Sequence, residues 1–194
     1  MKRGFLNEIL RSPRSIFSFK DLLLLWGGID RFTAGSRVNY YIRKGHLYPV
    51  RKGLYAKNKD YDKFELATKI CTPAYISFET VLGSAGITFQ FYGNIFIASY
   101  QPREIFCDGQ VYQFRKIKDA ILTSDVGMER RENYSIASKE RAFLDVVYLF
   151  KDYHFDNLSP INWDKVQEIL PIYGGNKRME KQLKKYHTAL KEEG

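Results

Sequence analysis

A helix that ends at a glycine and leads directly into a β-hairpin is the feature that most constrains how this chain folds. Residues 33–45 (TAGSRVNYYIRKG) place Val38, Tyr41 and Ile42 on one apolar face at helical spacing. Gly45 suits the position just after the helix, where the backbone takes a positive φ angle that glycine adopts easily. The sequence therefore predicts a helix that stops at this glycine.

The hairpin follows without a linker. Residues 46–50 and 53–56 are short, rich in aromatic and aliphatic side chains, and separated by two basic residues. Gly53 supplies the positive φ that the turn requires, and Pro49 confines its strand to the edge of a sheet because proline lacks an N–H group.

Two shorter helices are expected before this segment. Residues 3–10 carry apolar side chains on one face, namely Phe5, Leu6, Ile9 and Leu10. A second helix begins at Ser18, which forms a capping box with Asp21, and the third helix is expected to have its N-cap near Thr33 or Ser36. Helices followed by a two-stranded wing with a basic tip are the order of a winged helix-turn-helix.

The net charge of +9 lies entirely in this part of the chain. Residues 1–60 contain thirteen Lys and Arg against four Asp and Glu, whereas residues 61–194 contain eighteen of each sign. Such an asymmetry indicates a polyanion-binding domain over residues 1–60, attached to a neutral domain over residues 61–194. A basic membrane-surface helix is disfavoured, because glycines and Pro49 interrupt the region too often.

Nucleic acid is the expected polyanion. Arg and Asn side chains on a recognition helix bind base edges in the major groove of DNA, and basic residues at a wing tip bind phosphates. A solvated basic helix is the alternative interpretation. The candidate DNA-binding residues are Ser36, Arg37, Asn39, Tyr40, Arg43 and Lys44 on the third helix, with Arg51 and Lys52 in the wing.

Residues 61–194 alternate helical and strand patterns, which predicts an α+β domain. Residues 64–71, 77–82, 138–151, 162–170 and 176–192 have helical patterns, and residues 94–100 and 134–137 have strand patterns. Residues 104–107 and 111–117 are expected to pair around Asp108 and Gly109, a dipeptide typical of hairpin turns.

The sequence predicts no catalytic or metal site. Sequence motifs of nucleotide-binding loops, zinc proteases and serine hydrolases are absent. Cys71 and Cys107 are expected to be reduced packing residues, and the histidines are not at metal-ligand spacing. Asp145 lies on a largely apolar helical face, where pairing with Arg141 is favoured over catalysis. We expect no cofactor and a protein that is not an enzyme.

Localisation in the cytoplasm is expected. The best apolar run, residues 22–26, is too short to span a bilayer, and the N-terminus has no apolar region of the kind found in secretory signals.

Three stretches together resemble the AbiEi-like antitoxin family, which comprises transcriptional regulators of type IV toxin–antitoxin systems. They are residues 44–56 with the KGLYA element, residues 73–82 (PAYISFETVL) and residues 136–145 (IASKERAFLD). The similarity in order and spacing covers roughly residues 18–150, and the body positions that match are Ser77, Glu79, Ser138, Lys139 and Asp145. Ser77 and Ser138 are also explained as helix caps.

This resemblance implies an N-terminal winged helix that binds operator repeats in double-stranded DNA and represses its own operon. It also implies a C-terminal antitoxin domain that counters a nucleotidyltransferase-like toxin, in this family without necessarily binding it. Two alternatives remain open: an enzyme, such as a nuclease or a modifier of the toxin, with a DNA-binding head, and a protein-interaction module with an incidentally basic head.

Overall fold

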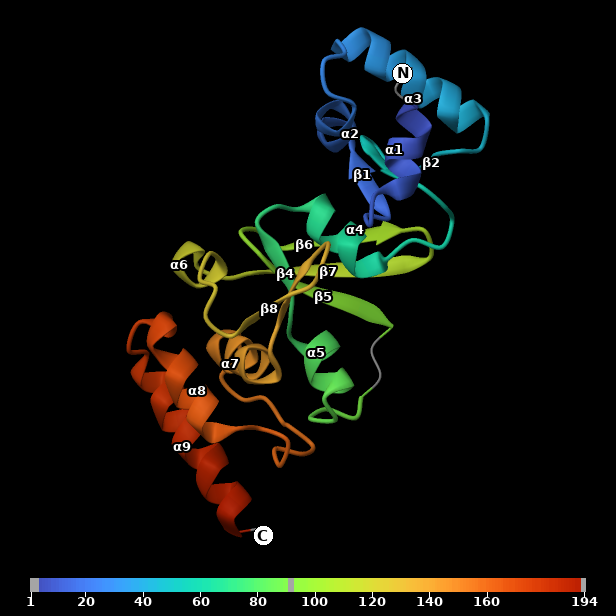
Figure 1. Cartoon of the computed structure of the whole chain (residues 1–194). Coiled ribbons are helices and arrows are strands. Elements are labelled where there is room, and N and C mark those ends of the chain that lie inside the picture. The colour runs from blue at the N-terminus through green and yellow to red at the C-terminus, as the bar shows by residue number, and fades with distance from the viewer. Residues whose placement is uncertain (1–3, 91–92, 193–194) are drawn as a thin grey trace. The chain divides into compact units, whose positions relative to one another are not determined.

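The structure, a computed structural model, describes residues 4–90 and 93–192 (Figure 1). The chain divides into two compact units, the first ending at Ile70 and the second beginning at Cys71. Each unit combines helices with a β-sheet, so the expected α+β class is confirmed. No helix within the described ranges has the length and hydropathy needed to cross a membrane.

The division falls after Ile70, rather than after residue 60 as the charge distribution suggested. Helix α4 (Lys63–Ile70) belongs to the first unit because its polar side chains bind that unit. The carboxylate of Glu65 accepts hydrogen bonds from the N–H and hydroxyl groups of Ser15 at 2.8 and 2.7 Å. Lys69 forms an ion pair with Asp21 at 2.8 Å.

A three-stranded antiparallel sheet lies within the first unit, with strand order β1-β3-β2. Only the hairpin was expected from the sequence, and β1 adds a strand that pairs with β3. β2 is an edge strand, as Pro49 predicted. The elements before α4 are α1 (Phe5–Arg11), β1 (Ile16–Ser18), α2 (Phe19–Trp26), α3 (Arg31–Arg43), β2 (Tyr48–Arg51) and β3 (Leu54–Ala56).

Local capping sets the bounds of α2 and α3. The capping box at α2 is confirmed, since Ser18 Oγ accepts from Asp21 N–H and Asp21 Oδ2 accepts from Ser18 N–H. The expected N-cap of α3 at Thr33 or Ser36 is wrong: Asp30 caps the helix and accepts the N–H of Thr33 at 2.9 Å. At the other end of α3, Gly45 has the predicted positive φ, +71°.

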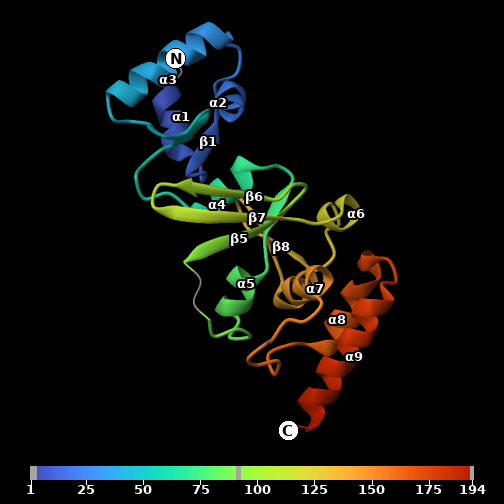
Figure 2. The ribbon, with the colours of Figure 1, turned by 180° about the vertical axis from the view of Figure 1, so that it is seen from behind.

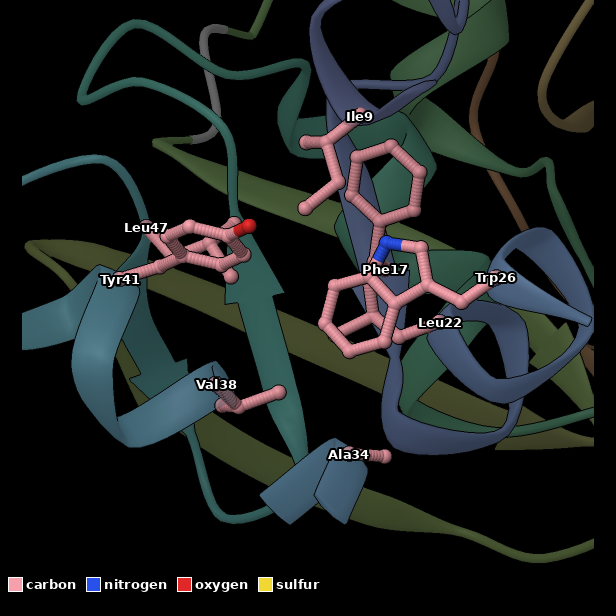
Figure 3. Close-up of a cluster of buried hydrophobic side chains, with 8 residues drawn as sticks. All are labelled: Ile9, Phe17, Leu22, Trp26, Ala34, Val38, Tyr41 and Leu47. Atoms are coloured by element: carbon pink, nitrogen blue, oxygen red, sulfur yellow. The ribbon is translucent and has the colours of Figure 1, made fainter. Parts of the chain in front are cut away.

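The core of the first unit lies where α1, β1, α2 and α3 meet (Figure 3). Trp26 is fully buried, and its indole N–H donates to the carbonyl of Phe5 at 3.1 Å. Of the apolar face expected for α1, Ile9 is fully buried as predicted, but Leu10 is 55% exposed. The buried side chains are Ile9, Phe17, Leu22, Trp26, Ala34, Val38, Tyr41 and Leu47.

The second unit is built on a six-stranded mixed sheet with the order β6-β7-β5-β4-β9-β8. β5 pairs with β7 and β4 with β9 in parallel, and the other neighbouring strands are antiparallel. The strands are β4 (Ala74–Ile76), β5 (Asn94–Ser99), β6 (Arg103–Cys107), β7 (Gln110–Lys116), β8 (Met128–Arg130) and β9 (Ser135–Ala137). The expected hairpin of β6 and β7 is confirmed, with positive φ at Asp108 and Gly109.

Helix α7 lies between this sheet and the last two helices of the chain (Figures 1 and 2). Ser138 caps α7, as predicted, by accepting the N–H of Arg141, and Asn162 caps α8. The helical segments are α5 (Glu79–Ser84), α6 (Asp119–Leu122), α7 (Lys139–Leu149), α8 (Trp163–Ile169), the 3₁₀ turn η1 (Leu170–Tyr173) and α9 (Lys177–Glu192).

The expectation that Ser77 caps the helix after it is wrong. Its hydroxyl donates to Asp145 Oδ2 at 2.7 Å, inside the unit. Helix α5 begins after Phe78, which has a positive φ of 56° and provides no side-chain cap. Ser77 is thus held by a tertiary contact, and not by the local geometry of a helix start.

Candidate nucleic-acid interface

Helix α3 turns a polar and basic face to solvent. Its buried positions are Ala34, Val38 and Tyr41, so the residues between them at helical spacing point outward. The exposed candidates on this side are Ser36, Asn39, Tyr40, Arg43 and Lys44, the last being the C-cap residue.

Two further residues at the start of α3 extend the exposed surface, and sequence analysis missed both. Phe32 is 85% exposed, although exposing a large apolar side chain to water is unfavourable. The guanidinium of Arg31 lies over the Phe19 ring, 5.6 Å from its centroid. Both were overlooked because the helix was expected to start at Thr33. Asp30, a good N-cap residue directly before them, was the signal that could have revealed them.

Arg37 differs from the other candidates on α3. It is only partly exposed, and its guanidinium carbon lies 4.3 Å from the centroid of the Phe5 ring on α1. Such a cation–π contact restricts the long side chain to one orientation. Arg37 therefore places a positive charge at a fixed position beside the outward face of α3. Its side chain is less mobile than those of the exposed candidates.

The wing residues lie in the connection between β2 and β3. Arg51 ends β2, Lys52 follows it, and both are exposed. Gly53 has a φ of +77°, which lets the chain reverse tightly at this point. The structure thus carries the eight candidate residues on two elements of the first unit: α3 with its C-cap, and the β2–β3 turn.

Carboxylates of the first unit leave this surface charged. Asp21 pairs with Arg14 and Lys69 at 3.1 and 2.8 Å, and neither of these cations is a candidate residue. Among the residues described, Arg43, Lys44, Arg51 and Lys52 take part in no ion pair. Exposed cations without carboxylate partners attract phosphates most strongly.

The second unit contains a buried ion pair between Asp145 and Arg141. Asp145 Oδ1 lies 3.4 Å from Arg141 Nε, and both side chains are fully buried. Hydroxyl groups of Ser77, Tyr75 and Tyr173 donate to the same carboxylate at 2.7, 3.0 and 2.7 Å. Burial raises the pKa of Asp145, while Arg141 and these hydroxyls act in the opposite direction. The predicted pairing of Asp145 with Arg141 is confirmed.

Arg141 is equally well bound. Its terminal nitrogens donate to the carbonyls of Val126 at 2.6 Å and Ile121 at 2.7 Å, and to the hydroxyl of Tyr75 at 3.0 Å. The cluster therefore ties α7 to β4, to the α6 segment and to η1. Every polar atom that it uses serves the fold, and none is left aimed at a ligand.

The remaining family-like body positions also have structural contacts. Glu79 Oε2 accepts a hydrogen bond from Arg115 at 2.6 Å, and the guanidinium of Arg115 lies over three aromatic rings. Lys139 lies 4.0 Å from Glu140. Residues 4–90 and 93–192 contain no group of three His, Cys, Asp or Glu side chains that could hold a metal ion.

Comparison of the chain with models of known protein families gave no match. A comparison with curated protein sequences also found no significant relative.

Proposed function

We propose that the first unit is a winged helix-turn-helix that binds double-stranded DNA. In support, its elements follow the order helix, strand, helix, helix, strand, strand, and α3 is the second of two successive helices, where a recognition helix stands. The carrying observation is the exposed face of α3, whose Arg43 and Lys44, like Arg51 and Lys52 of the wing, have no ion-pair partner among the described residues.

In this proposal the candidate residues have two roles, contact with base edges and contact with phosphates. Ser36 and Asn39 are short enough to reach base edges in the major groove, and an Asn amide matches adenine. Arg43 and Lys44 at the end of α3, with Arg51 and Lys52 in the turn, neutralise phosphates and set the orientation on the duplex.

The same proposal assigns the whole chain to the regulation of a toxin. The resemblance to AbiEi-like antitoxins suggests that the protein binds operator repeats in its own promoter as an autorepressor. The second unit then acts as the antitoxin domain against a nucleotidyltransferase-like toxin. An enzyme with a DNA-binding head has less support, because two buried carboxylates of the second unit, Glu79 and Asp145, are paired with Arg115 and Arg141.

Fluorescence anisotropy with a labelled duplex from the protein's own promoter tests the DNA-binding part. Affinity should fall steeply with salt, by about 0.9 log units per log unit of salt for each phosphate neutralised. The double substitution Arg51→Ala/Lys52→Ala should reduce that slope and weaken binding to every sequence alike. Asn39→Ala should instead narrow the preference for promoter over scrambled DNA.

Arg130 and Arg131 provide a matched control for the wing. They are also adjacent, basic and exposed, but each has a carboxylate partner, at 2.8 and 2.9 Å. Arg130→Ala/Arg131→Ala should leave the slope unchanged. The proposed interface would be overturned if the wing variant and the Arg130→Ala/Arg131→Ala variant lost DNA affinity equally. It would also be overturned if the protein did not bind the promoter at low salt.

If the resemblance holds, a nucleotidyltransferase-like toxin is encoded beside this protein, and co-expression with that toxin tests the antitoxin part. The Arg51→Ala/Lys52→Ala variant should derepress the promoter and still restore growth, because the antitoxin activity is assigned to the second unit. Loss of growth rescue in this variant, at equal protein level, would contradict the division of functions.

A further inference from the structure

A basic pocket lies in the second unit, between α9 and the chain that follows α7. Its volume is about 540 Å³, and it is open to solvent. This is the size range of pockets that hold a small organic ligand, and it is far larger than a single ion needs. The DNA-binding proposal makes no use of it.

Positive charge dominates the pocket wall. Arg178, Lys181 and Lys185 are spaced three and four residues apart on α9, so they lie along one side of the helix, and Lys151 faces them from the preceding segment. Asp152 is the single carboxylate in the lining. No ion pair within the described ranges involves any of the three lysines.

Arg178 is held rigidly, whereas the three lysines have no ion-pair partner among the described residues. The two terminal nitrogens of Arg178 donate to the carbonyls of Tyr148 at 2.6 Å and Phe150 at 3.0 Å. These contacts leave its positive charge unneutralised beside the pocket. Each lysine ammonium has three donors, so the site can bind several anionic oxygens at once.

Two tyrosines of the pocket lining, Tyr153 and Tyr186, are fixed in place. Tyr186 donates its hydroxyl to the carbonyl of Tyr153 at 2.7 Å. Both rings pack on Phe155, with centroid distances of 4.8 Å for Tyr153 and 5.2 Å for Tyr186. Gln182 also donates to the carbonyl of Lys151. These bonds join α9 to the opposite wall, so the pocket is formed before any ligand arrives.

We propose that this pocket binds a nucleoside polyphosphate. Several phosphates match the cluster of cations better than a single anion does, and a planar base matches the tyrosine rings of the lining. The ligand would place its phosphates along Lys181 and Lys185 of α9, with Lys151 opposite. The site belongs to the second unit, and none of its lining residues is a candidate DNA-binding residue.

Isothermal titration calorimetry of the full chain tests this site with the four common ribonucleoside triphosphates and with inorganic tripolyphosphate. At least one nucleotide should bind saturably at one site per chain, and more tightly than tripolyphosphate. The substitution Lys181→Glu/Lys185→Glu should weaken it by about tenfold or more for each lysine, the value expected for a hydrogen bond to a charged group.

The same helix supplies a control of equal charge. Lys177 and Lys184 are exposed on α9 but do not line this pocket, so Lys177→Glu/Lys184→Glu should retain the affinity. The milder change Lys181→Gln/Lys185→Gln, compared by circular dichroism, separates loss of the site from loss of the fold. Three results would overturn the proposal: no binding of any nucleotide, equal binding of tripolyphosphate, or equal losses in the two charge-reversed variants. Failure here with intact DNA binding would leave the proposed function standing.

Discussion

Arg141 and Asp145, one turn apart on α7, form an ion pair with both side chains fully buried and with Nε and Oδ1 3.4 Å apart. The carboxylate receives three hydroxyl hydrogen bonds in addition. A buried pair of this kind adds little net stability over an apolar pair of the same size, but removing one partner leaves an uncompensated charge. The cluster therefore specifies how α7, β4 and η1 are joined, more than it strengthens the fold.

Asp145→Ala should destabilise the second unit by about 3–5 kcal/mol, because Arg141 would remain buried without its counter-ion. Hydrogen exchange read by mass spectrometry should show faster exchange over α7 and β4. The double substitution Arg141→Met/Asp145→Leu should recover much of this loss, since it removes both charges together.

The exposed pair of Asp125 and Arg130 is the control for this change. Its side chains are 77% and 76% exposed, and they lie 2.8 Å apart. Asp125→Ala should cost less than about 1 kcal/mol, as exposed pairs do. Similar costs at Asp125 and Asp145 would contradict the importance assigned to burial.

Asp30→Ala should destabilise the first unit, because the N–H of Thr33 loses its capping oxygen. Ser36, the alternative that the sequence suggested, is exposed within the helix. Ser36→Ala should therefore change stability by no more than about 0.5 kcal/mol. Denaturant unfolding in a Trp163→Phe background reports on this unit through Trp26, since the chain has two tryptophans. A larger loss at Ser36 than at Asp30 would place the cap where the sequence alone put it.

Features set by neighbouring residues could be predicted from the sequence. The capping box of Ser18 and Asp21 and the hairpin turn at Asp108 and Gly109 depend on a few adjacent residues, and both are present. β1 was missed because three residues carry no visible alternation, and its pairing partner β3 lies far along the chain. Ser77 was assigned as a cap for the same reason: its partner Asp145 is remote in sequence.

In the candidate interface too, features set by nearby residues could be predicted, whereas those that depend on tertiary packing could not. The outward face of α3 followed from the spacing of Val38 and Tyr41, which are buried as predicted. The position of Arg37 over the Phe5 ring depends on how α1 packs against α3, and no local pattern encodes it. The basic pocket on α9 was not foreseen either, because its lining combines α9 with residues 151–154, and a helical pattern over 176–192 does not show which other segment packs beside it.

Acid should weaken the first unit through Asp21. Burial acts to raise the pKa of this carboxyl, but hydrogen bonds from Lys69 and Ser18 outweigh burial, and the pKa is lowered. Because the folded pKa lies below the unfolded value, the stabilising contribution is complete above about pH 4 and is lost as the pH falls through the folded pKa. The Asp21→Asn variant should have a lower free energy of unfolding at neutral pH. Its free energy of unfolding should also fall less steeply as the pH is lowered. Parallel acid-unfolding curves, followed by Trp26 fluorescence, would contradict this assignment.

Gly127 supports the buried cluster through a close approach of the backbone. Its φ is +73°, and an added Cβ would lie 2.7 Å from Ile169 Cδ1 and 3.1 Å from Arg141 Cβ. Gly127→Ala therefore combines backbone strain with overpacking, and it should cost about 2–4 kcal/mol. At Gly45, φ is similar at +71° but nothing lies within 4 Å of the added atom. Gly45→Ala should cost only the backbone part, about 1 kcal/mol. Thermal unfolding of the two variants measures the difference, and equal shifts would mean that Ile169 and Arg141 yield freely to the new methyl group.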